Sequence, residues 1–291
     1  MRFEGLKCRY LIKKAARPRI KGGNSYVFNS VYNASQVFQA MSLTPSNQPS
    51  THPSDNTAAR GLAVVIGAQG GLGAALQVQL ERGGHYAQVL GLGRRTDPGI
   101  DFLQEASIAS AAQAVAGVCA AAHLELRLLI VATGFLHGAS GQPERSWTNL
   151  DAGYLDHVFK INTLGPALVM KHFFPLLPKQ GRCVAGLMSA KVASIADNAL
   201  GGWYGYRASK AALNQLVKTA SIELTRRNRQ SICVALHPGT VSTALSEPFA
   251  KTGLTVRPAL EAAGDLLAVL DTLVPADTGC LVDYLGQKLP F

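Results

Sequence analysis

The sequence predicts a doubly wound α/β domain, in which helices cover both faces of a parallel β-sheet. From Gly61 onward, short apolar runs alternate with amphipathic helical stretches, which is the pattern of repeated strand–helix–strand units. The first apolar run stops at a cluster of glycines that opens a helical stretch. The chain has 291 residues and is 47% hydrophobic, which suffices for one such domain with a substantial core.

The expected strands and helices follow one another in regular alternation. The first strand is Leu62 to Ile66, and the helix after it begins near Gly71. Further strands are expected at residues 88–92, 127–132, 182–188, 231–237 and 280–283. Further helices are expected to begin near Gln104, Asp151, Tyr206 and Pro258. Residues 61–291 are therefore expected to form a single folded domain.

Residues 1–60 differ in composition from the rest of the chain. Arg2 to Lys21 is basic and poor in acids, and Thr44 to Thr57 is rich in Ser, Thr, Pro and Asn. Such a segment buries too little apolar surface to fold, so we expect a disordered N-terminal extension. It could be a transit peptide for a mitochondrion or plastid. It could also be an upstream extension of the reading frame, with Met41 as the natural start; we favour this second interpretation and a cytoplasmic location.

The net charge of +10 comes mainly from the same segment. Nine of the 28 Lys and Arg residues, but two of the 18 acids, lie in residues 1–60. The predicted domain is left close to neutral and shows no basic stripe, so we expect no nucleic-acid partner. No run approaches the roughly 18 consecutive apolar residues that cross a bilayer, so we expect no membrane association.

The cysteines and histidines do not predict a metal site or a disulfide framework. The five cysteines include no C-x-x-C pair, and the histidines are scattered without H-x-H or H-x-x-x-H spacing. Structural zinc sites and disulfide-rich folds need such closely spaced ligands or an even set of cysteines. We expect no bound metal and a reducing compartment.

The glycine cluster predicts a site for the pyrophosphate of a dinucleotide. The segment from Gly67 to Gly73 reads Gly-Ala-Gln-Gly-Gly-Leu-Gly and joins the first strand to the first helix. A helix N-terminus offers free N–H groups and a partial positive charge, and glycines let a phosphate approach the backbone. The expected contacts are Gly67, Gln69, Gly71, Leu72 and Gly73.

Two arginines follow the second strand and favour NADP(H) over NAD(H). An NAD-preferring site has a carboxylate here for the ribose 2′-hydroxyl, whereas an arginine suits a 2′-phosphate. No acid lies between Glu81 and Asp97, and Arg94 and Arg95 stand at the end of the strand. The alternative is a solvated charge pair in a loop.

Tyr206 and Lys210 are the expected acid–base pair. A tyrosine is a poor acid–base group near neutral pH unless its phenolate is stabilised. A lysine four residues later lies one helical turn on, and its charge lowers the tyrosine pKa. The same spacing starts at Tyr10 and at Tyr284. Only Tyr206 opens a helical run behind a strand, so position in the fold decides the assignment.

Several motifs, in order, resemble those of the short-chain dehydrogenase/reductase family, and in particular its C-factor and sniffer-like carbonyl reductases. The glycine loop is similar to the family's TGxxxGxG, with Ile66 in place of the threonine. The others are Val131-Ala132-Thr133-Gly134 for NNAG, Phe159-Lys160-Ile161-Asn162, His237 to Thr243 for PGxVxT, and Asp283 to Phe291 for the C-factor ending. The resemblance covers residues 61–291 and implies a Rossmann-type NADP(H)-binding domain.

The resemblance also implies roles for individual residues. Tyr206 would donate the proton, Lys210 would lower its pKa and bind the ribose, and Asn162 would hold the lysine through water in a proton relay. Asp101 would contact the adenine amine. Further cofactor contacts are implied at Gly134, Pro238, Gly239, Val241 and Thr243. The family often forms homodimers or homotetramers through helices corresponding to residues 151–174 and 206–225.

One position departs from the family pattern. The family has a serine whose hydroxyl binds the substrate carbonyl, and the matching position here is Ala190. Losing such a donor raises the barrier by roughly 3 kcal/mol, about a hundredfold in rate. We expect Ser189 to take this role through a small change of register. The alternatives are that Ser194 folds back into the site, or that activity is low.

The expected function is hydride transfer between NADP(H) and a small-molecule carbonyl or alcohol. The segment Thr243 to Thr255 corresponds to the family's variable substrate lid, and its Leu245 and Phe249 suggest an apolar substrate. Two alternatives remain: reduction of 3-oxoacyl thioesters, and an NADPH-binding regulatory protein with weak catalysis, which would explain Ala190.

Overall fold

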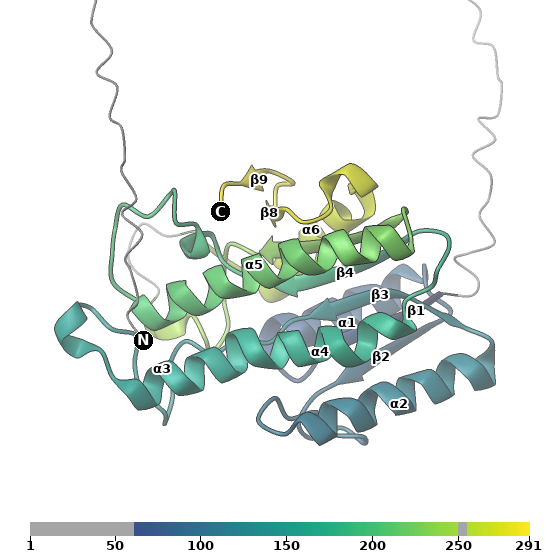
Figure 1. Ribbon diagram of the computed structural model, residues 1–291, viewed down its shortest axis with the longest axis horizontal. Coiled ribbons are helices and arrows are strands. Elements are labelled where there is room, and N and C mark those ends of the chain that lie inside the picture. Colours follow the sequence, from purple (N-terminus) through teal and green to yellow (C-terminus); the bar gives the residue numbers. More distant parts are fainter. Residues whose placement is uncertain (1–60, 250–254) are drawn as a thin grey trace, which may run out of the picture. The chain divides into compact units, whose positions relative to one another are not determined.

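The computed structural model describes residues 61–249 and 255–291, and within them a seven-stranded sheet forms the centre of the fold. The strands lie in the order β2-β1-β3-β4-β5-β8-β9 (Figure 1). They are β1 (Gly61–Ile66), β2 (Gln88–Leu92), β3 (Glu125–Val131), β4 (Cys183–Met188), β5 (Ser231–His237), β8 (Leu281–Asp283) and β9 (Lys288–Leu289). All neighbours pair in parallel except β9, which runs antiparallel to β8.

Helices cover both faces of this sheet. One face packs against α1 (Gly71–Gly83) and α6 (Ala259–Thr272), and the other against α2 (Glu105–Ala122), α4 (Gly165–Phe173) and α5 (Tyr204–Arg227). Alternate residues of β1 enter opposite cores: Leu62, Val64 and Ile66 join the α2 side, whereas Ala63 and Val65 join the α1 side. Strands buried on both faces are expected to be continuous apolar runs in the sequence. The parallel sheet with helices on both faces confirms the expected doubly wound Rossmann-type fold.

Most elements agree with those expected from the sequence. β2 and β5 have the expected bounds, β1, β4 and β8 each begin one residue away, and β3 covers Glu125–Val131 instead of 127–132. The helix expected near Asp151 is interrupted: α3 (Ala152–Phe159) leads through a π-helical turn, Lys160–Leu164, into α4. A separate two-stranded ribbon of β6 (Thr240–Val241) and β7 (Val256–Arg257) was not expected. The extension over residues 1–60 lies outside the described residues.

The order of the strands creates a crevice at the carboxyl ends of the central strands. β1 pairs with β2 on one side and with β3 on the other, so the chain reverses its winding direction between β1 and β3. In open α/β sheets ligands bind outside the carboxyl ends of the strands at such a switch point. Expected site residues lie in the segments after β1, β2, β3, β4 and β5, and these segments therefore meet at the carboxyl ends of the strands.

Candidate active site

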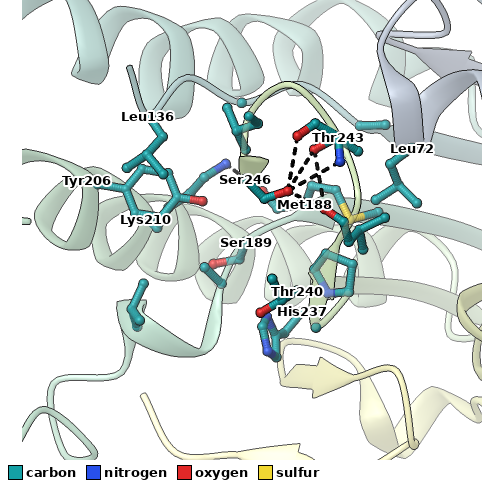
Figure 2. Close-up of a pocket in the computed structure, with 18 of the residues that line it drawn as sticks. Leu72, Leu136, Met188, Ser189, Tyr206, Lys210, His237, Thr240, Thr243 and Ser246 are labelled. Carbon is teal, nitrogen blue, oxygen red and sulfur yellow. Dashed lines mark hydrogen bonds between the residues drawn. The ribbon is translucent and has the colours of Figure 1, made fainter. Parts of the chain in front are cut away.

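A cavity of about 360 Å³ lies at the carboxyl ends of the strands. Its walls come from the glycine loop, the segments after β3, β4 and β5, and the first turn of α5 (Figure 2). Apolar side chains form much of the wall, and polar groups are contributed by residues such as Ser189, Tyr206 and Lys210. A mainly apolar cavity with a few convergent polar groups is typical of a small-molecule site.

The glycine loop has the geometry of an anion site. After β1, Gly67 adopts a left-handed conformation with φ +89, and the Gly70 N–H donates to the Gly67 carbonyl at 2.9 Å. α1 begins at Gly71, and its N-cap Gly70 provides no side-chain cap. A β-carbon on Gly73 would overlap the Gly67 carbonyl oxygen. The loop therefore leaves helical N–H groups uncapped by side chains, as phosphate binding needs.

The loop after β2 is connected to the glycine loop. The Arg95 N–H donates to Gln69 Oε1 at 3.1 Å, and the side chains of Arg94 and Arg95 are exposed. The structure thus brings both arginines next to the expected pyrophosphate site. Asp101 is half-buried, and its carboxylate accepts a hydrogen bond from the Leu103 N–H at 3.0 Å. Its contact with adenine stays a prediction.

Tyr206 and Lys210 are buried together on α5. Tyr206 is 7% exposed and Lys210 is 1% exposed, and both line the cavity (Figure 2). The Lys210 ammonium donates to the Met188 carbonyl at 2.7 Å. Burial raises the pKa of Tyr206 to about 12 and lowers the pKa of Lys210 to about 7. Desolvation therefore acts on the Tyr206 pKa in the opposite direction to the lowering expected from the lysine charge.

Asn162 is fixed by hydrogen bonds in the π-helical turn. Its Oδ1 accepts from the Phe135 N–H at 2.8 Å, and its Nδ2 donates to the Phe135 carbonyl at 2.9 Å and to Ser209 Oγ at 3.1 Å. The Ser209 hydroxyl in turn donates to the Tyr206 carbonyl at 2.9 Å. π-turns inside helices are frequently found at functional sites. Ser209, which the sequence did not single out, thus connects Asn162 to the helix that carries Tyr206.

Gly134 keeps the space in front of these groups open. A β-carbon on Gly134 would lie 3.7 Å from Lys210 Nζ and 3.9 Å from Asn162 Oδ1. The segment after β3 thus passes close to both groups and lines the cavity with its backbone. The structure therefore brings Gly134, Asn162 and Lys210 together, as the resemblance implied.

The segment after β5 forms the part of the cavity wall that adjoins the glycine loop. Gly239 has φ +74, and a β-carbon on Gly71 would lie 2.8 Å from Thr243 Cγ2, which packs against the glycine loop. The expected contacts Pro238, Gly239, Val241 and Thr243 all line the cavity. Thr243 therefore closes this wall against the start of α1.

Two buried polar atoms at the cavity lack a partner among the described residues. They are Thr133 Oγ1 and His237 Nδ1, and both residues line the cavity. Burial lowers the pKa of His237 to about 4, so its ring is neutral at physiological pH. Both atoms have almost no accessible surface, so they lie in the wall behind the cavity surface. The uncapped helix N-terminus and the close turn at Gly67 and Gly73 fit the pyrophosphate of a nicotinamide dinucleotide.

Ser189 and Ser194, the two candidates for the missing donor, differ in their position relative to the cavity. Ser189 lines the cavity and is buried, and its hydroxyl donates to Asn214 Oδ1 at 2.6 Å. Ala190 packs in the same apolar cluster as Tyr206. The Ser194 hydroxyl accepts from the Asp197 N–H at 3.1 Å, away from the cavity lining. Ser189 therefore lies in the cavity wall, but its hydroxyl donates to Asn214; its role in catalysis stays a prediction.

Aromatic side chains form the substrate end of the cavity. The Phe249 ring contacts the rings of His137 and Trp203, with centroids 5.3 and 5.2 Å apart. His137 Nε2 lies 3.0 Å from the Ala244 carbonyl, which fixes the segment after β5 to the segment after β3. Thr243 to Phe249 thus borders the cavity, and its role as a substrate lid stays a prediction. Residues 250–254 of that segment lie outside the described residues.

Comparison with known proteins identifies the family. The model of the family described as "short chain dehydrogenase" matches residues 61–253. The chain belongs to the short-chain dehydrogenase family. It is therefore an oxidoreductase of a family that uses nicotinamide cofactors.

Individual relatives agree with this assignment. The chain is 36% identical to the C-signal protein of Myxococcus xanthus over 143 residues. This alignment covers 48% of this chain and 82% of that protein. The fold matches the carbonyl reductase Sniffer of D. melanogaster with a TM-score of 0.69 and 23% identity, over 80% of this chain and 99% of that one. An NADPH-bound carbonyl reductase from chicken fatty liver matches with a TM-score of 0.68 and 24% identity, over 80% and 94%.

Proposed function

We propose that this protein is an NADP(H)-dependent reductase of small-molecule carbonyls, or a dehydrogenase of the corresponding alcohols. The observation that supports it best is the buried Tyr206–Lys210 pair, which faces a mainly apolar cavity whose other end is the glycine loop. A carbonyl compound held against Tyr206 would also contact Leu136 and Trp203, which line the same cavity. This environment suits an apolar substrate.

The residues of the cavity have complementary tasks. Bound NADP(H) supplies or accepts the hydride. The Tyr206 hydroxyl keeps its proton at neutral pH, because burial raises its pKa to about 12, and it can therefore donate that proton to a developing alkoxide. The Lys210 ammonium stabilises the phenolate that remains. The Asn162 side chain, through its hydrogen bonds to the Phe135 backbone, joins the π-helical turn to the segment after β3. At Gly134 this segment passes close to Lys210.

Cofactor choice is proposed from the loop after β2. Arg94 and Arg95 are exposed beside Gln69, which accepts a hydrogen bond from the Arg95 backbone. Their charges would attract the 2′-phosphate of NADP(H). The NADPH-bound state of the chicken carbonyl reductase supports the same choice.

A panel assay tests the proposal. NADPH oxidation would be measured with aromatic and aliphatic ketones and aldehydes, for the wild type and for Tyr206→Phe. We expect Tyr206→Phe to lower kcat on the order of 10²- to 10⁴-fold, the usual contribution of a positioned acid. Tyr204→Phe, a change of the same kind on the more exposed first residue of α5, is the matched control and should keep activity. Full activity of Tyr206→Phe would disprove the assignment of the acid.

The same panel separates the two alternatives. Preferential reduction of acetoacetyl thioesters would indicate a 3-oxoacyl-thioester reductase. A regulatory NADPH-binding protein is favoured by one observation: Ala190 has no hydroxyl, and the Ser189 hydroxyl donates to Asn214. Such a protein would bind NADPH, measured by calorimetry, yet turn over no carbonyl in the panel.

A further inference from the structure

Glu144 is a buried acid that the mechanism above does not use. It lies in the irregular segment between β3 and α3 and is 2% exposed. Among residues 61–249 and 255–291, no Lys, Arg or His side chain forms an ion pair with it. A buried carboxylate without a cation needs strong hydrogen bonds to remain there.

The carboxylate of Glu144 obtains its hydrogen bonds from the start of α5. Its two oxygens lie 3.1 and 3.2 Å from the N–H of Gly205, the second residue of that helix. The N-cap residue itself, Trp203, provides no side-chain cap. A carboxylate at a helix N-terminus satisfies a free N–H and interacts favourably with the helix dipole. Glu144 thus caps α5 from about sixty positions earlier in the chain.

The backbone of Glu144 holds the turn that precedes α5. Its carbonyl accepts a hydrogen bond from the Trp203 N–H at 2.5 Å. Gly201, Gly202 and Trp203 all have left-handed backbones, with φ of 64, 66 and 53. For tryptophan this conformation is unfavourable and needs support from its surroundings. The Arg207 guanidinium gives further support by donating to the Gly201 and Gly202 carbonyls.

Gly205 is the position that permits this close approach. A β-carbon there would lie 3.0 Å from Glu144 Oε1, from Leu155 Cδ2 and from Tyr154 Cε1. Any side chain at 205 would therefore push against the carboxylate and the neighbouring helix α3. The absence of a side chain lets Glu144 reach the helix backbone.

Trp203 and Tyr206 lie close to the helix start that Glu144 caps. Tyr206 follows Gly205 directly, and the Trp203 ring packs edge-on against the Tyr206 ring with centroids 6.1 Å apart. Trp203 also contacts Phe249 at the substrate end of the cavity. We propose that Glu144 is a positioning residue for Tyr206 and Trp203, which it sets at the cavity by capping α5 and holding the left-handed turn. The proposal rests on the function of Tyr206 proposed above.

The test combines kinetics with a signal from Trp203. Trp147 and Trp203 are the two tryptophans of the chain, so in a Trp147→Phe background the emission reports on Trp203 alone. In that background we expect Glu144→Ala to lower kcat on the order of 10- to 100-fold, since displacements of about 1 Å have effects of this size. The Trp203 emission should shift to the red and acrylamide quenching should increase. Glu144→Gln should restore most of both, because its amide oxygen still accepts from Gly205.

Asp151→Ala is the matched control for the loss of a cap. The Asp151 carboxylate accepts from the Tyr154 N–H at 2.7 Å and caps α3. This variant should lose similar stability while kcat and Trp203 emission change little. If Glu144→Ala does not fold, Gly205→Ala carries the test: alanine favours the helix, yet its β-carbon displaces the carboxylate, so kcat should still fall and the emission shift.

The possible failures are distinguishable. If Glu144→Ala or Gly205→Ala keeps kcat within twofold and leaves the Trp203 emission unchanged while Tyr206→Phe is inactive, the positioning role is wrong and the proposed acid stands. If Tyr206→Phe is fully active, the proposed function is wrong. The emission of the Glu144 variants then still decides whether this carboxylate holds Trp203.

Discussion

Replacing Lys210 with methionine should remove activity and make the protein more stable at mildly acidic pH. Lys210 is 1% exposed, and its ammonium has one hydrogen-bond acceptor in the structure, the Met188 carbonyl at 2.7 Å. Burial lowers its pKa from the ordinary 10.5 to about 7. This difference corresponds to about 5 kcal/mol of free energy that disfavours the folded, charged form. Methionine has a similar length and no charge to desolvate.

The net gain is smaller because the substitution also removes a hydrogen bond. A buried carbonyl left without a donor costs about 1–3 kcal/mol, so Lys210→Met should stabilise the fold by about 2–4 kcal/mol at pH 6. The difference in free energy of unfolding between the two proteins should become smaller as the pH rises. Between the folded pKa of about 7 and the unfolded value of 10.5, the unfolded state binds more protons, so wild-type stability increases with pH. At pH 9 the two proteins should differ by less than about 1 kcal/mol.

Urea unfolding at pH 6, 7.5 and 9 measures this effect. Lys218→Met, a change of the same kind at an exposed position of α5, is the control and should change stability by less than about 0.5 kcal/mol. A Lys210→Met variant that is less stable than the wild type at pH 6 would contradict the cost of burying this charge. Equal slopes of unfolding free energy for the two proteins between pH 7 and 9 would contradict the lowered pKa of Lys210.

Three further predictions use residues of the glycine loop and of the cavity wall. Gly73→Ala should abolish NADPH binding in calorimetry or prevent folding, because its β-carbon would overlap the Gly67 carbonyl; normal affinity would contradict the glycine-loop geometry. His237→Gln should flatten the loss of stability between pH 6.5 and 4, because burial lowers the His237 pKa to about 4 and the wild-type unfolded state binds the extra proton in that window. Ala190→Ser should raise kcat up to about a hundredfold by adding a carbonyl donor beside Tyr206, and an unchanged kcat would show that another group already fills that role.

The fold and the position of Tyr206 and Lys210 at the cavity could be predicted because their signals are local. A strand buried on both faces is a continuous apolar run such as Leu62 to Ile66, and a strand-to-helix turn without side chains needs glycines such as Gly67. The spacing of Tyr206 and Lys210 follows from one helical turn. Each of these features depends on a few consecutive residues. The structure brings the glycine loop, Tyr206 and Lys210 together at the cavity.

The remaining features depend on contacts between distant segments. The π-helical turn at Lys160–Leu164 carries Asn162, whose side chain bonds to Phe135, and no period in the sequence marks it. The hydrogen bond from Ser189 to Asn214 joins β4 to α5 across 25 positions. Propensity and spacing describe neighbours along the chain, so they could not show that this hydroxyl is already engaged.

The absence of a hydroxyl at Ala190 increases the importance of how Tyr206 is held. With the Ser189 hydroxyl donating to Asn214, the proposed chemistry depends on the Tyr206 hydroxyl, which lies at the cavity in an apolar cluster. A reaction that relies on one donor is more sensitive to its orientation than one with two. Tyr206 lies in the first turn of α5, where helices fray most easily unless their ends are satisfied. The Glu144 carboxylate on Gly205 and the Ser209 hydroxyl on the Tyr206 carbonyl fix this turn from both sides. The structure therefore restrains the helical turn that carries the residue on which the proposed chemistry depends most.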